Sequence, residues 1–267
     1  MSIIKAYLLP HSPLLIPEIG RANHAFLNKT MVAYDKIRAD ILNNKIDTLI
    51  IFSPHINLGS SGFLINCAPE MTIDFQDFGF IPPKISIKGD VPLADQIKNT
   101  LKETTPIQII SEDTLDYGSG VPLYLLKKQS LFPKIIVISS SDELNLTTHF
   151  ELGQKLSSVL ENSEKRIALI ASGDLSHRLK RKSPGGYSPK GPKFDNKLIE
   201  HLSDSSSAIE NILKLDKRLI LDASECGLKP IVMSLGTINN RSWQADILAY
   251  QTDFGVGYLS LEFCLNH

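Results

Sequence analysis

The sequence predicts a three-layer α/β/α sandwich, in which a mostly parallel or mixed sheet lies between two layers of helices. Short runs rich in β-branched residues alternate with longer amphipathic stretches along the chain, and this is the order that α/β proteins show. The short runs are apolar throughout, as strands buried on both faces are. With 267 residues, 42% of them hydrophobic, the chain can form one large core. We therefore expect a single α/β domain over residues 1–267.

Six apolar runs have the length and composition of strands. They cover residues 3–9, 48–52, 107–110, 134–139, 167–171 and 256–263. The last run fits an antiparallel neighbour as well as a parallel one. The stretches between the runs carry apolar residues at helical spacing, which predicts helices over residues 22–43, 93–103, 148–160, 194–202, 207–213 and 226–237.

Two segments interrupt this alternation. Residues 67–90 contain Phe75, Phe78 and Phe80 among several prolines, and residues 178–193 are rich in glycine, proline and basic residues. Long irregular loops in compact domains often line or cover a binding site. We expect both segments to act in this way.

Composition and charge exclude several classes of partner. The chain has 28 Lys and Arg against 29 Asp and Glu, a net charge of −1, which favours neither nucleic acid nor an anionic membrane surface. Its 3 cysteines are far apart and form no CxxC pair, as in proteins of a reducing cytoplasm. The N-terminal run lacks the basic region and cleavage site of a signal peptide, and no stretch approaches the ~20 apolar residues of a membrane span. We expect a cytoplasmic protein.

Two histidines follow predicted strands in rigid backbone. His11 lies between Pro10 and Pro13, and His55 directly follows Pro54. Proline restricts its own backbone and that of the residue before it, and a rigidly held imidazole suits a metal ligand. A turn histidine bonded to the backbone is the alternative for each. Because open α/β sheets gather ligand-binding groups at the carboxyl ends of their strands, the two imidazoles can converge on one site.

A third histidine, His177, ends the run Gly173-Asp174-Leu175-Ser176-His177 after the strand at 167–171. This loop has little to bury, so a purely structural role explains the histidine poorly. Imidazole both accepts and returns protons near neutral pH. We expect His177 at the same edge of the sheet, as an acid/base beside a metal.

A carboxylate and a thiol, Glu225 and Cys226, open the last predicted helix. A carboxylate at a helix start is also explained by the helix dipole. Two imidazoles and one carboxylate form the facial triad of non-haem Fe(II) oxygenases, whereas a thiolate shifts the preference towards Zn or Cu. Metal-dependent hydrolysis is a further alternative, although no second nucleophile stands out.

Taken in order, these motifs resemble those of the class III extradiol ring-cleavage dioxygenases, the LigB-like superfamily. The matching segments are residues 10–13, 53–55, 115–123, 172–177 and 225–227. The resemblance implies a LigB-like fold and Fe(II) bound by His11, His55 and Glu225, with His177 as the acid/base. It also implies a catechol-type aromatic substrate cleaved with O₂, a homo-oligomer, and a small second subunit as a further partner.

One departure concerns the substrate. Established catechol-cleaving members commonly read Asp-His-Gly where this chain has Asp116-Tyr117-Gly118. Tyr117 replaces a group that titrates near neutral pH with a phenol that titrates near pH 10, and we expect it to donate a hydrogen bond to the substrate. Within the superfamily, the chain resembles B-subunit-like members near the Memo-like branch of the AmmeMemoRadiSam group. Those proteins use a cysteine near the third ligand position, which implies a metal-binding or partner-binding protein without ring cleavage as the alternative, with Cys226 as ligand.

Overall fold

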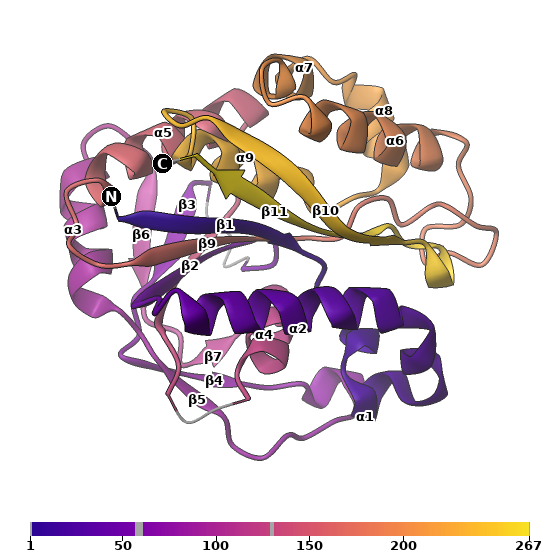
Figure 1. Cartoon of the computed structure of the whole chain (residues 1–267), viewed down its shortest axis with the longest axis horizontal. Helices are drawn as coiled ribbons and strands as arrows, with labels where there is room; N and C mark the ends of the chain where they lie inside the picture. Colours follow the sequence, from indigo (N-terminus) through magenta and orange to yellow (C-terminus); the bar gives the residue numbers. More distant parts are fainter. Residues whose placement is uncertain (1, 57–60, 129–130, 267) are drawn as a thin grey trace.

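A central mixed sheet forms the middle layer of the computed structural model, which describes residues 2–56, 61–128 and 131–266 (Figure 1). Within these residues the sheet has 8 strands in the order β10-β11-β1-β9-β2-β8-β3-β6. Their bounds are β1 (Ile3–Leu9), β2 (Thr48–Ser53), β3 (Phe63–Asn66), β6 (Ile107–Ile110), β8 (Lys134–Ser139), β9 (Ile167–Ser172), β10 (Trp243–Gln251) and β11 (Tyr258–Leu265). The neighbours β1, β9, β2 and β8 are parallel, and β3, β10 and β11 each pair antiparallel with a neighbour. The expectation of a mixed sheet is therefore confirmed.

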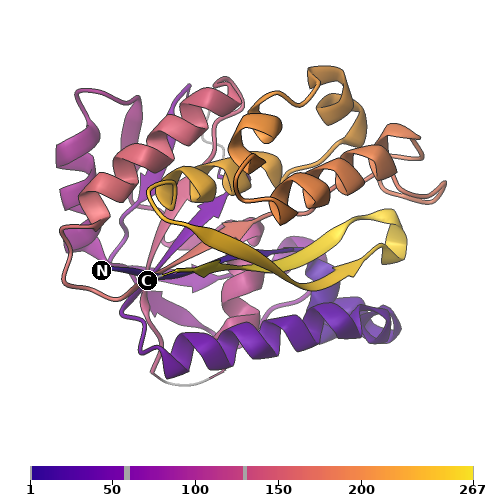
Figure 2. The ribbon, with the colours of Figure 1, turned by 45° about the horizontal axis from the view of Figure 1, so that its top comes forward.

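Helices cover both faces of this sheet (Figure 2). Side chains of β1 and β2 alternate between the two faces: Leu8 and Phe52 pack in the core beneath one helix layer, and Leu9 and Ile51 in the core beneath the other. The first layer contains α3 (Val91–Leu101), α5 (Leu146–Leu160), α6 (Lys190–Ser203), α7 (Ala208–Leu213), α8 (Lys217–Ala223) and α9 (Leu228–Thr237). The second contains α2 (Asn28–Asn43) and α4 (Tyr117–Leu126). The three-layer α/β/α architecture is confirmed.

Local capping explains where several helices begin. The side chains of Asp90, Asn145 and Asp216 each accept a hydrogen bond from a backbone N–H in the first turn, of α3, α5 and α8 respectively. Such caps satisfy N–H groups that have no partner inside the helix. The predicted helix over 22–43 is divided, because a 3₁₀ segment, η2 (Arg21–Leu27), precedes α2. The remaining short helices are η1 (Pro13–Leu15), α1 (Pro17–Gly20), η3 (Gln76–Phe78) and η4 (Asp253–Gly255).

The two irregular segments differ in structure. Residues 67–90 contain β4 (Glu70–Ile73) and β5 (Ser86–Lys88), which form a second sheet with β7 (Thr114–Leu115). Phe75 in this segment is 1% exposed and belongs to the core. The segment is therefore not irregular throughout, and the expectation that Phe75 covers a site is wrong, because its ring packs in the core. Residues 178–189 do lack helix and strand, and α6 then begins at Lys190.

The parallel strands place the candidate chemistry at one edge of the sheet. Strands β1, β2 and β9 run in the same direction, so the residues that follow them, including His11, His55 and His177, leave the sheet at the same end. In the part of the chain that the structure describes, no helix has the length and apolar character needed to cross a membrane.

Candidate metal centre

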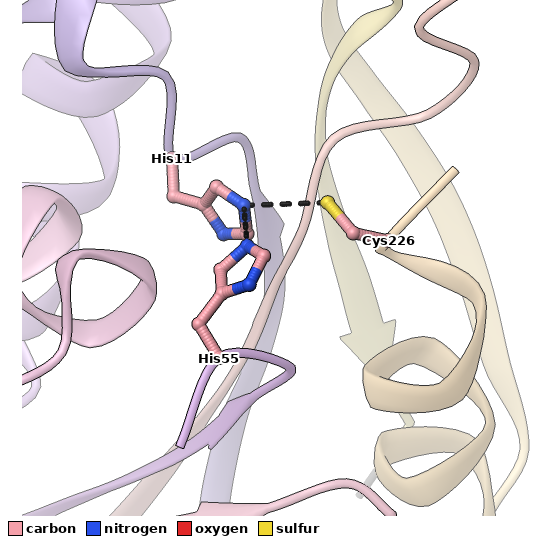
Figure 3. A group of neighbouring side chains, drawn as sticks. All are labelled: His11, His55 and Cys226. Carbon is pink, nitrogen blue, oxygen red and sulfur yellow. Dashed lines mark hydrogen bonds between the residues drawn. The ribbon is translucent and has the colours of Figure 1, made fainter. Parts of the chain in front are cut away.

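Two imidazoles and one thiol meet at this edge (Figure 3). His11 Nε2 lies 3.1 Å from His55 Nε2 and 3.3 Å from Cys226 Sγ. The three side chains come from the ends of β1 and β2 and from the segment before α9, and their ligand atoms all lie within 4.8 Å of one another. A tetrahedral ion bound at ~2.1 Å to nitrogen and ~2.3 Å to sulfur requires ligand atoms roughly 3.3–3.8 Å apart. The two separations from His11 Nε2 lie close to the lower end of this range, so small side-chain adjustments let these residues hold one metal ion with one or more further positions open.

A serine orients the His11 ring. The Ser172 hydroxyl donates to the carbonyl oxygen of Gly118, so its oxygen is left to accept from His11 Nδ1, 2.9 Å away. That hydrogen bond places the proton of a neutral imidazole on Nδ1 and leaves the lone pair of Nε2 directed at His55 and Cys226. Metal-binding histidines commonly have such a partner on the second nitrogen.

Burial keeps both imidazoles neutral. Desolvation lowers the pKa of His11 well below its ordinary value, and the neighbouring His55 lowers it further. Desolvation also lowers the pKa of His55. Since only neutral imidazole binds a metal, both rings are in the binding form at neutral pH.

Tyr117, the first residue of α4, lies over the two histidines. Its ring stacks on that of His55 at a centroid distance of 4.2 Å and meets the ring of His11 edge-on at 5.5 Å. This approach depends on Gly118, because a Cβ there would lie 2.6 Å from Ser53 Oγ and 2.9 Å from His55 Cδ2. Burial raises the pKa of Tyr117, so the phenol keeps its proton and can donate a hydrogen bond.

His177 lies beside the group of His11, His55 and Cys226 and is not part of it. Its Nδ1 lies 2.7 Å from the carbonyl oxygen of Ser224, and because a carbonyl only accepts, Nδ1 must carry the proton. Nε2 is then the basic nitrogen, 3.9 Å from Asp174 Oδ2. Burial lowers the pKa of His177. The ring is therefore a neutral base at pH 7 with a defined proton-accepting atom.

Asp174 is a site residue that we did not single out from the sequence. Its Oδ1 accepts from the backbone N–H of His11 at 3.0 Å, and its backbone N–H lies 3.3 Å from Cys226 Sγ. Burial raises the pKa of Asp174 to about 7. In the sequence, Asp174 is marked only by its position in the loop after the strand at 167–171, three residues before His177.

Glu225 lies next to Cys226 in sequence and has a different environment. Its Oε2 accepts from the backbone N–H of Leu228 at 2.6 Å, in the first turn of α9. Burial raises its pKa to about 7. Among the described residues, the close group of candidate ligands contains Cys226 and does not contain Glu225.

A cavity of about 400 Å³ opens on this centre. It is lined by His11, Ser12, Pro13, Leu14, Phe78, Tyr117, Asp174, His177, Pro184, Phe254, Val256 and Tyr258. Its size and mainly apolar wall suit a small organic ligand. Of the aromatics expected to cover a substrate, Phe78 lines the cavity and contacts Tyr117, whereas Phe75 packs against Phe80 and Tyr124.

A third buried carboxyl group, that of Asp195, supports the loop that carries His177. Its oxygens accept from the Ser176 backbone N–H at 2.9 Å and from the Tyr250 hydroxyl at 2.7 Å. Burial raises the pKa of Asp195 to about 6, against about 4 for an unfolded carboxyl group. Between these values the folded protein keeps a proton that the unfolded chain loses, so this group's contribution to stability falls as pH rises from 4 to 6.

Substituting Asp195→Asn removes this titration. We expect the variant to gain stability relative to the wild type as pH rises from 4 to 6, by on the order of 3 kcal/mol at most, because one pKa unit is worth about 1.4 kcal/mol. Urea unfolding of both proteins at pH 4.5, 5.5, 6.5 and 7.5 measures this difference. A difference that does not change with pH would show that Asp195 is ionised in the folded protein throughout.

Comparisons with known proteins identify the family. A family model described as "Catalytic LigB subunit of aromatic ring-opening dioxygenase" matches residues 5–260. "Protein CA_C1420" of Clostridium acetobutylicum is 31% identical over 268 residues, which is 97% of this chain and 57% of that protein. The chain thus spans little more than half of this relative's length.

Two Escherichia coli proteins are more distant. "3,4-dihydroxyphenylacetate 2,3-dioxygenase" is 22% identical over 209 residues, covering 73% of this chain and 74% of that protein. The crystal structure of "uncharacterized protein JW3007" superposes with a TM-score of 0.70 at 17% identity, covering 97% of this chain and 99% of that one, which shows a shared fold. The family match extends over nearly the whole chain, and the protein belongs to the LigB family of aromatic ring-opening dioxygenase catalytic subunits.

Proposed function

We propose that the protein is a metal-dependent extradiol dioxygenase that opens the ring of a small catechol-type substrate with O₂. The observation that carries this proposal is the shared cavity, in which His11, Tyr117 and His177 face the same space of about 400 Å³. A ligand atom, a hydrogen-bond donor and a base thus surround one substrate-sized volume. Family membership and the E. coli relative named for dioxygenase activity support the same reaction class.

The proposed metal ligands are His11, His55 and Cys226. Their ligand atoms all lie within 4.8 Å of one another, and the Cys226 thiol lies within hydrogen-bond distance of His11 Nε2, 3.3 Å away. Burial raises the pKa of the Cys226 thiol, so metal binding would displace its proton, as it does for coordinating thiols generally. Fe(II), when bound, would supply the open coordination positions and the redox chemistry that a reaction with O₂ requires.

The protein's own groups then have distinct roles. The His177 Nε2 accepts the phenolic proton of the catechol, and the protonated ring returns a proton as the aromatic ring opens. The Ser224 carbonyl holds Nδ1–H in both states. Tyr117 keeps its proton and donates a hydrogen bond to the substrate, and Phe78 covers the aromatic ring from the side of η3. The basic residues 180–182 are exposed and are proposed to meet an anionic substituent.

A second candidate function is metal binding without ring cleavage, as in the Memo-like proteins. The specific observation in its favour is the thiol at the third ligand position. A thiolate ligand favours Zn or Cu, whereas the facial triad of Fe(II) oxygenases has a carboxylate at that position. Tyr117, at a position where catechol-cleaving members commonly have histidine, also favours this second candidate.

Metal content and O₂ uptake separate the two. Protein prepared without oxygen and loaded with Fe(II) is expected to bind about one ion per chain. On adding catechol or 3,4-dihydroxyphenylacetate it should consume one O₂ per substrate molecule, with both oxygen atoms in the ring-opened product. A protein that binds the metal at the same site and consumes no O₂ with either compound would support the second candidate instead.

A further inference from the structure

A bulky residue in a strained backbone lines the cavity. Phe254, in the η4 turn between β10 and β11, has φ 59° and ψ 11°, in the left-handed region. For a large non-glycine residue this conformation is an outlier, because Cβ approaches the neighbouring backbone. Strain of this kind persists only where the surrounding structure imposes it, and it gathers at ligand-binding sites.

The surrounding structure does impose this turn. The Leu175 N–H donates to the Gly257 carbonyl at 2.8 Å, and the Gly257 N–H donates to the Ser176 carbonyl at 2.9 Å. The Gly255 carbonyl accepts from the Leu179 N–H at 3.1 Å and from the Ser183 hydroxyl at 2.7 Å. The tip of the β10–β11 hairpin is therefore bonded along the loop that carries His177.

The crowding around Gly255 admits only glycine at this position of the turn. Gly255 also has a positive φ, 74°, and a Cβ at this position would lie 2.0 Å from Ser183 Oγ. Two consecutive residues at the hairpin tip, Phe254 and Gly255, thus have a positive φ. Hydrogen bonds from the His177 loop hold this tip in place.

The ring itself forms a wall of the cavity. Phe254 lines the space together with His177 and Pro184, and on its other side it meets Phe26 edge-to-face at a centroid distance of 6.1 Å. Phe26 is 61% exposed, so this contact lies at the surface of the protein. The ring is partly buried and also packs against the core, so it has both a structural contact and a face on the cavity.

We propose that Phe254 is a specificity-determining residue, held in the cavity by its strained turn so that it limits the size of the substituent on the aromatic substrate. This inference rests on the proposed function. It predicts that the wild type discriminates against catechols with a bulky group opposite the diol, and that removing the ring relaxes this discrimination.

The test compares catechol with 4-tert-butylcatechol in the Fe(II)-loaded protein. For Phe254→Gly we expect the ratio of kcat/KM for catechol to that for 4-tert-butylcatechol to fall about tenfold or more, the scale on which a hydrophobic pocket discriminates by size. We also expect tighter anaerobic binding of 4-tert-butylcatechol. Glycine relieves the left-handed backbone strain, but the variant also loses the packing of the ring against the core and Phe26, so the binding and kcat/KM measurements carry the test. Phe254→Leu keeps the strain and reduces the side chain, and should fall between the two proteins.

A matched control is Lys45→Gly. Lys45 also has a positive φ, 48°, but it follows α2 and lies just before β2, at the opposite edge of the sheet from the metal centre. Its substitution relieves the same kind of backbone strain without removing a wall of the cavity, and should leave the kcat/KM ratio unchanged. If wild-type protein neither binds nor turns over either catechol, the proposed function is wrong and this inference falls with it. If the wild type is active and both Phe254 variants keep its ratio and its binding, this inference alone is overturned.

Discussion

Cys226→Ser is expected to weaken metal binding by about 100-fold or more, whereas Glu225→Gln is expected to leave it nearly unchanged. Removing a residue that only hydrogen-bonds to a metal ligand already lowers metal affinity by about 10–100-fold. Removing a direct ligand should therefore lower the affinity by ~100-fold or more. Cys226 Sγ lies 3.3 Å from His11 Nε2. The Glu225 carboxylate instead accepts from the Leu228 backbone N–H, a contact that glutamine can keep through its carbonyl oxygen.

Chelator competition on the loaded proteins measures this difference, and Co(II) gives a second signal because a thiolate ligand produces a charge-transfer absorption. Cys264→Ser is the matched control, since Cys264 is also a partly buried free thiol but lies on β11 outside the group. Loss of metal in Glu225→Gln, together with its retention in Cys226→Ser, would make the carboxylate the third ligand and return the site to a facial triad.

His177→Gln is expected to lower kcat by about 10²–10⁴-fold, the usual contribution of a general acid/base, while metal content stays at the wild-type level. Glutamine can keep the hydrogen bond to the Ser224 carbonyl through its amide N–H but cannot exchange a proton with the substrate. In the wild type the neutral ring is the active form of the free enzyme. Because burial lowers the pKa of His177, kcat/KM should fall only on the acid side of about pH 6.5, and this acid limb should disappear in the variant.

His201→Gln is the control, because His201 lies in α6 and belongs to neither the cavity lining nor the group of candidate ligands. Steady-state rates between pH 5 and 8, with metal analysis of the same preparations, show whether His177 transfers a proton or binds the metal. If His177→Gln loses its metal, His177 is a ligand. If it keeps both metal and full activity, another group transfers the proton.

Much of the fold is visible in local sequence patterns. β1 and β8 have the predicted bounds, and the buried parallel strands read as unbroken apolar runs because both of their faces are covered. α4 is not visible in the same way. Gly118, Gly120 and Pro122 all disfavour a helix, yet the helix forms because Asp116 caps it and its apolar residues are buried against the sheet and the hairpin of the second sheet.

The candidate site, like the fold, is only partly visible in local sequence patterns. Strand exits and proline neighbours mark His11 and His55 in the linear sequence, and the direction of parallel strands is enough to bring them to one edge. Tyr117 could be located through its motif, but its stacking on His55 depends on α4 and on the absence of a side chain at Gly118.

The order of residues along the chain was enough to specify the layered α/β class and the sheet edge at which the candidate site residues gather, because hydrophobic period and strand direction are local properties. The choice between Glu225 and Cys226 depends on how the chain enters α9, where adjacent side chains point in different directions: one accepts from the helix backbone and the other faces His11. Tertiary contacts likewise place Phe75 in the core and Phe78 and Phe254 at the cavity. Which side chain of a near-equivalent set faces the site is set by contacts between segments far apart in the chain, and no local pattern records those contacts.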